Sequence, residues 1–144
     1  MIQTYQGTIY TWQCDFMGHM NVMHYVGIFD QATWNLFGHF GLTAQYLREN
    51  DKGMVALEQH IRYKKELLAG DNVRVESEFL WIKGKIAHFR HYMLKSESKE
   101  VAAITELTGL HMDIKARKGL EMPAEYAGRI QTWIDENPPS SEND

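Results

Sequence analysis

A carboxylate and several polar residues are gathered between Cys14 and Tyr25, in the run Cys-Asp-Phe-Met-Gly-His-Met-Asn-Val-Met-His-Tyr. Asp15 stands in a glycine-containing turn, and Asn21 is a good N-cap for a helix that begins directly after it. The first amides of such a helix lack intrahelical partners, so they present hydrogen-bond donors and a partial positive charge. A carbonyl group could be polarised by these amides beside the Asp15 carboxylate.

Asp15 is the candidate catalytic residue. Taken alone, an aspartate in a loop is more often an ordinary turn or capping residue. Near a reactive carbonyl, however, a carboxylate can attack the carbonyl carbon or remove a proton from attacking water. The sequence leaves both roles open. The resulting oxyanion would be held by a main-chain amide of the helix's first turn, at Val22, Met23, His24 or Tyr25.

The other residues of the run have simpler interpretations. Asn21 is expected to cap the helix, and His19 is expected to shape the turn by packing or hydrogen bonding rather than to react. Tyr25 falls on the apolar helix face, where it belongs to the core or lines a pocket beside the loop. Cys14 beside an aspartate suggests a nucleophile with a histidine base, but adjacent residues at a strand end point opposite ways, which favours a structural cysteine.

The seven histidines do not predict a metal site. Neither His19 with His24 nor His88 with His91 reproduces a strong zinc spacing. We therefore expect no metal.

Residue periodicity places the run between a strand and a helix. The types in Tyr5–Gln13 suit a strand, and apolar residues then recur at steps of four and three, so a helix is expected over Val22–Phe40 with Gly41 as its C-cap. Alternating segments predict four further strands, at about 55–63, 73–81, 86–95 and 101–114. Pro123 begins a predicted C-terminal helix. One helix followed by consecutive strands indicates an α+β fold with antiparallel pairing.

Much of the chain also resembles a known family. The residues that carry the resemblance are Cys14, Asp15, Gly18, His19, Met20, Asn21 and Tyr25, followed by Asp30, and then His60 to Tyr63, Leu67, Leu68, Gly70 and Asp71. They resemble hotdog-fold acyl-CoA thioesterases of the 4-hydroxybenzoyl-CoA thioesterase type, and the similarity runs from about Tyr5 to Ile114. One departure is Gln13, which stands where many relatives carry a second acidic residue.

The resemblance implies a hotdog fold, in which a long central helix packs on a five-stranded antiparallel sheet, here with an added C-terminal helix. It implies hydrolysis of an acyl-CoA to free acid and coenzyme A, with Asp15 as base or nucleophile and no cofactor besides the coenzyme A of the substrate. The implied substrate-binding residues are His19, Asn21, Val22, Tyr25, Lys83 and Lys85. The family also implies a homodimer with active sites at the interface, or a homotetramer of two dimers.

Length and composition set the remaining expectations. With 144 residues, 44% of them hydrophobic, the chain fits one domain over residues 1–136 and a disordered polar tail over 137–144. A net charge of −4 argues against general binding to nucleic acid or anionic membranes. One cysteine, no evident signal peptide and no membrane-spanning run predict a cytoplasmic protein.

Two other functions remain open at this stage. A hotdog hydratase or dehydratase would use Asp15 and His19 as a proton-transfer pair, although the hydratase motif spaces these residue types differently. A non-catalytic domain could bind acyl-CoA in the same pocket, although the presence of Asp15 speaks against it. A thioester hydrolase is the leading interpretation.

Overall fold

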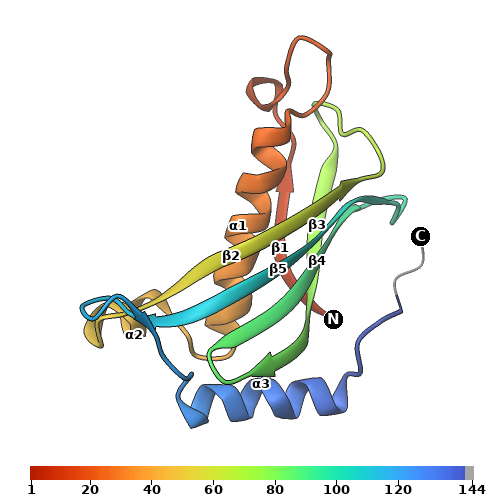
Figure 1. Ribbon diagram of the computed structural model, residues 1–144. Helices are drawn as coiled ribbons and strands as arrows, with labels where there is room; N and C mark the ends of the chain where they lie inside the picture. The colour runs from red at the N-terminus through yellow and green to blue at the C-terminus, as the bar shows by residue number, and fades with distance from the viewer. Residues whose placement is uncertain (142–144) are drawn as a thin grey trace. The chain divides into compact units, whose positions relative to one another are not determined.

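The structure, a computed structural model, describes residues 1–141 (Figure 1). Its elements in chain order are β1 (Ile2–Thr8), the short 3-10 helix η1 (Thr11–Gln13), α1 (Val22–His39), α2 (Ala44–Glu49), β2 (Lys52–Tyr63), β3 (Asn72–Lys83), β4 (Ile86–Lys95), β5 (Val101–Asp113), β6 (Lys118–Gly119) and α3 (Ala124–Glu136). The sheet order is β1-β3-β4-β5-β2, with β6 paired to β5. The predicted long helix, five long strands and C-terminal helix are all present.

The chain divides into two compact units, which share the long strands. The first unit contains residues 1–36, 60–77 and 91–105, and the second contains the rest of the described chain. The prediction of a single domain over 1–136 is therefore neither confirmed nor contradicted. Of the predicted tail, residues 142–144 lie outside the described residues.

The first strand differs from its prediction. It ends at Thr8, which pairs with Asn72, the first residue of the antiparallel strand β3. The residues after Thr8 therefore have no residue of β3 left to pair with. The following residues instead form η1, in which the amide of Gln13 donates to the carbonyl of Tyr10 at 3.0 Å. The Gln13 side-chain oxygen accepts from the Tyr10 amide at 2.8 Å. This turn is closed by one glutamine side chain bonded to the backbone three residues before it. A single contact of this kind leaves no periodic pattern in the sequence, so the end of the strand was not predicted.

The core of the first unit is the contact between α1 and the strands. Side chains from one face of α1 pack on residues of β3, β4 and β5, as the helical spacing predicts. Its fully buried members include Phe29, Ala32, Val75, Met93 and Ala102. Burial of this apolar surface, at roughly 25 cal/mol per Å², fixes the helix against the sheet. The N-terminus of α1 is thereby held in place as well.

A chain of polar groups crosses this apolar core. His91 is fully buried, with Nδ1 2.5 Å from the Ser77 hydroxyl and Nε2 2.9 Å from the Thr33 hydroxyl. Because the Thr33 hydroxyl donates to the Phe29 carbonyl, it accepts from His91 Nε2–H, and Ser77 donates to Nδ1. The Ser77 oxygen in turn lies 2.7 Å from the Thr4 hydroxyl. A neutral imidazole satisfies both neighbours, and burial lowers the pKa of His91 to about 3.

The second unit has an aromatic core of its own. Phe37, Phe79 and Phe89 pack on one another with ring centroids 5.2–6.2 Å apart. Phe40 extends this cluster to Trp133 of α3, whose ring lies 6.2 Å away. These contacts pack α3 against the aromatic core. A helix of this length needs such packing because it is not stable in isolation.

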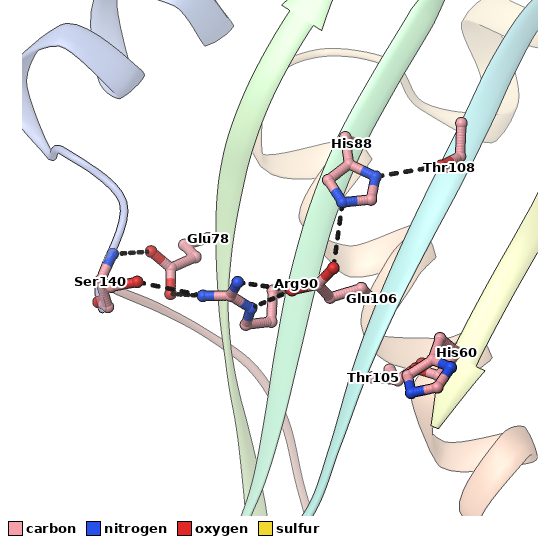
Figure 2. A network of polar contacts seen from close by, with 8 residues as sticks. All are labelled: His60, Glu78, His88, Arg90, Thr105, Glu106, Thr108 and Ser140. Atoms are coloured by element: carbon pink, nitrogen blue, oxygen red, sulfur yellow. Dashed lines mark hydrogen bonds and ion pairs between the residues drawn. The ribbon is translucent and has the colours of Figure 1, made fainter. Parts of the chain in front are cut away.

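Charged side chains of the second unit hold the segment after α3 (Figure 2). Glu78 is 2% exposed, and its Oε1 accepts from the Ser140 amide at 2.8 Å, while Arg90 donates to the Ser140 carbonyl at 3.2 Å. Arg90 also pairs with Glu106, whose carboxylate contacts His88. A buried carboxylate and a buried guanidinium therefore bind both polar groups of one backbone residue.

The buried state of His91 predicts a pH-dependent stability. In the unfolded chain the imidazole titrates near its ordinary pKa of about 6.5, whereas the folded pKa is about 3. Between these values the unfolded state binds the extra proton, so the free energy of unfolding falls as the pH is lowered from about 6.5, by up to about 1.4 kcal/mol per pH unit. Urea unfolding at pH 7, 6 and 5 measures this loss.

The matched control for this prediction is His91→Gln, which keeps polar atoms at the site but cannot titrate there. Wild type should lose more stability than the variant over the same pH steps. Equal slopes for the two proteins would contradict a neutral, buried His91.

Candidate active site

The loop that carries Asp15 is pinned at both ends by backbone hydrogen bonds. The Asp15 amide donates to the His19 carbonyl at 3.1 Å, and the Gly18 amide donates back to the Asp15 carbonyl at 2.9 Å. Gly18 has a φ of +87°, a conformation that side chains with a Cβ rarely adopt, so glycine is required there. Met20 is anchored by its amide to the Leu67 carbonyl at 2.7 Å. The loop thus presents Asp15 from a defined backbone.

The Asp15 carboxylate accepts one hydrogen bond on each oxygen. Asn21 Nδ2 donates to Oδ2 at 3.1 Å, and the Met17 amide donates to Oδ1 at 2.9 Å. These bonds, with Asn21 the larger contribution and Met17 next, lower the pKa of Asp15 below its ordinary value. Asp15 is partly exposed. It is therefore a charged, accessible carboxylate at neutral pH, the state that a base or nucleophile needs.

Asn21 connects this carboxylate to the start of α1. Its side-chain oxygen accepts from the Met23 amide at 3.0 Å, so Asn21 caps the helix as predicted while its Nδ2 holds Asp15. The His24 amide is engaged by the Asn21 carbonyl at 3.0 Å. The Val22 amide, by contrast, has no acceptor within residues 1–141. The amides of Met23 and His24 are thus engaged, whereas Val22, the first residue of α1, has no intrahelical acceptor for its amide and is a candidate to bind an oxyanion.

A cavity of about 310 Å³ lies beside the N-terminus of α1. Its wall is formed by His19, Met20, Val22, Tyr25, Tyr63, Lys64, Lys65 and Glu66. Three of the predicted substrate-binding residues, His19, Val22 and Tyr25, line it. Asp15 and Asn21 do not belong to the wall. The Asp15 amide, however, is bonded to the carbonyl of His19, which lines the cavity, and Asn21 directly precedes Val22, which lines it too. The cavity is large enough for a small acyl group.

Two tyrosines form one corner of this cavity. The rings of Tyr25 and Tyr63 have centroids 5.1 Å apart and planes at 86°. Tyr25 is buried, and its hydroxyl donates to the Lys65 carbonyl at 3.3 Å. Burial, followed by the neighbouring Tyr63, raises the pKa of Tyr25 to about 12. The phenol is therefore neutral and fixed, and it serves the cavity as an aromatic surface.

The two predicted lysines lie elsewhere in the chain. Lys83 ends β3 and Lys85 precedes β4, in a hairpin whose Gly84 has a φ of +60°. Both belong to the second unit, and neither lines the cavity. Their contact with the nucleotide part of a substrate stays a prediction.

Sequence reasoning missed half of the cavity wall. Tyr63, Lys64, Lys65 and Glu66 come from the end of β2 and the segment after it, forty residues or more beyond the loop. The available signal was the resemblance at residues 60–63, which was assigned to a strand only. The Cys14 side chain packs against the core, and its Sγ donates to the Tyr10 carbonyl at 3.7 Å. Both contacts agree with the structural cysteine that the sequence favoured.

No cluster of three or more histidine, cysteine or acidic side chains within 1–141 could hold a metal ion. No helix in this part of the chain has the length and apolar character needed to cross a membrane.

Comparison with known proteins gives three consistent matches. The model of the thioesterase-like superfamily matches residues 9–133. An L-carnitine dehydrogenase/betainyl-CoA thioesterase of Agrobacterium fabrum is 35% identical over 109 residues, which are 76% of this chain but 22% of that protein. A betainyl-CoA thioesterase of Pseudomonas aeruginosa is 24% identical over 131 residues, covering 91% of this chain and 82% of that one.

The fold has close counterparts among solved structures. A Staphylococcus aureus protein solved in complex with CoA superposes with a TM-score of 0.90 at 20% sequence identity, covering 99% of this chain and 92% of that one. The predicted hotdog fold is confirmed.

The double role of Asn21 can be separated by two substitutions. Asn21→Ser keeps an oxygen that can cap α1 but removes the amide donor to Asp15, so the pKa of Asp15 should rise towards its ordinary value with little loss of stability. Asn21→Ala removes both bonds and should cost about 1 kcal/mol in addition. A pH titration of the Asp15 carboxyl carbon by NMR, with thermal unfolding in parallel, measures both effects. An unchanged Asp15 pKa in Asn21→Ser would contradict the assignment.

Proposed function

Because this chain belongs to the thioesterase-like superfamily, we propose that it hydrolyses the thioester bond of an acyl-CoA to a free acid and coenzyme A. The observation that carries the proposal is the Asn21 side chain, which joins the charged Asp15 carboxylate to the capped N-terminus of α1. An acceptor-free Val22 amide and a cavity for an acyl group lie at the same place. A carboxylate and one good donor are a sufficient minimal site for a reactive thioester.

The proposed chemistry uses these groups directly. The thioester carbonyl oxygen accepts a hydrogen bond from the Val22 amide, which stabilises the negative charge that develops on it. Asp15 either removes a proton from water as the water oxygen attacks, or attacks the carbonyl carbon itself to form an anhydride that water then opens. In both routes the carbon–sulfur bond breaks, and the thiolate of coenzyme A leaves and takes up a proton.

Betainyl-CoA is the first substrate to test. Relatives in Agrobacterium fabrum and Pseudomonas aeruginosa carry this thioester in their names, and we extend it to this chain as a candidate. We further propose that Lys83 and Lys85 contact the phosphates of coenzyme A, and that the protein acts in the cytoplasm without a cofactor. The single cysteine, Cys14, fits a reducing compartment.

The role of Asp15 predicts a large effect of a small change. Asp15→Asn keeps the size of the side chain but removes the charge and the basic oxygen, so kcat/KM should fall by roughly two to four orders of magnitude. Thiol release from a panel of short, long, aromatic and cationic acyl-CoAs measures it. The variant's unfolding should be checked first, because Asn21 loses a charged partner. Activity that survives in a folded Asp15→Asn protein would move the chemistry elsewhere.

We also propose that a second copy of the chain covers the surface of the catalytic loop, giving a homodimer or a homotetramer of two dimers. Large apolar side chains follow one another on the outside of this segment, and the exposed ones are Tyr10, Trp12, Phe16, Met17, Val22 and Met23. Phe16 is 99% exposed. Apolar exposure concentrated in one short segment marks an interaction site rather than ordinary surface.

Analytical ultracentrifugation tests this assembly. Wild type should sediment as a dimer or tetramer, and Phe16→Asp should shift the population towards monomer because it places a charge in the covered surface. Leu120→Asp, at an exposed apolar position of the second unit, is the matched control and should leave the assembly unchanged. A monomeric wild type would contradict the proposal.

A further inference from the structure

We propose that Tyr25, Tyr63 and Glu66 form a subsite that selects an acyl group carrying a positive charge. The inference rests on the proposed thioesterase function and goes beyond it by assigning the residues that read the acyl group. All three side chains line the same cavity as Val22 of the catalytic region. The subsite is therefore placed where the acyl chain of a bound thioester would extend.

The tyrosine corner suits a cation. Aromatic ring faces carry partial negative charge, and a cation within about 6 Å of a ring centroid is attracted to them. The Tyr25 and Tyr63 rings pack nearly perpendicular to each other, and Tyr63 is 48% exposed, so part of its ring surface remains available at the cavity. The bond from the Tyr25 hydroxyl to the Lys65 carbonyl holds that ring in position. A fixed aromatic surface can bind a cation without first being ordered.

Glu66 adds a carboxylate to this wall. It is the acidic residue of the cavity lining, its side chain is 73% exposed, and its ion-pair partner within residues 1–141 is His19, at 3.8 Å. A neutral acyl group would have to strip water from this carboxylate without replacing the lost interactions. A cationic acyl group compensates the charge instead.

The lysines of the wall fit the same arrangement. The Lys65 ammonium lies 3.7 Å from Glu100, so its charge is already countered. Lys64 also lines the cavity, and we do not assign it to the subsite.

A pair of isosteric thioesters tests the inference. Betainyl-CoA and 3,3-dimethylbutanoyl-CoA differ in one atom of the acyl group, a quaternary nitrogen in the first and a quaternary carbon in the second. Wild type should prefer betainyl-CoA in kcat/KM by about tenfold or more, as expected for a cation over aromatic rings beside a carboxylate. Glu66→Gln and Tyr63→Leu should each reduce this ratio several-fold, whereas Tyr63→Phe, which keeps the ring face, should preserve it.

Controls separate this inference from the function on which it rests. Glu49→Gln, an exposed glutamate of α2, should leave the ratio unchanged. If wild type hydrolyses neither these compounds nor other acyl-CoAs, the proposed function fails. If it hydrolyses both with similar kcat/KM, or if the preference survives Glu66→Gln and Tyr63→Leu, the thioesterase stands and the cation subsite is refuted.

Discussion

The double hydrogen bonding of the Asn21 side chain is the constraint on which the site depends. One end of the amide holds the Asp15 carboxylate, and the other caps α1. Neither serine nor aspartate could do both, since serine lacks the reach of an amide and aspartate would repel Asp15. The amide therefore fixes the distance between the Asp15 carboxylate, the proposed base or nucleophile, and the helix end proposed to bind the carbonyl oxygen. The positive φ of Gly18 completes the loop that makes this contact possible.

The core of the first unit holds α1 in the position that the Asn21–Asp15 contact requires. Apolar packing seats α1 on the strands, and the Ser77–His91–Thr33 chain satisfies the polar groups that are enclosed with it. Each buried donor finds an acceptor only when the strands and the helix are in register, so the network penalises displaced arrangements. The helix N-terminus is consequently positioned by residues that lie outside the candidate site. The candidate site is thus a short loop at the end of a helix that is packed on a sheet.

Local sequence signals predicted the parts that depend on neighbours in the chain. The helical spacing of Tyr25, Phe29 and Ala32 placed α1 within a residue of its observed end, and the Asn21 cap followed from residue type alone. The cavity wall did not follow, because Tyr63 and Glu66 meet the loop only after β2 has joined the sheet. The two-residue β6 was also missed, since it is too short to show alternation. Pairing distant in sequence leaves little local trace.

The most direct test of the account is a crystal structure of folded Asp15→Asn with betainyl-CoA bound. We expect the thioester carbonyl oxygen about 3 Å from the Val22 amide, residue 15 facing the carbonyl carbon, and the trimethylammonium group between Tyr63 and Glu66. A thioester bound with its carbonyl remote from the α1 N-terminus would contradict the central claim that Asn21 joins Asp15 and the helix end into one catalytic site.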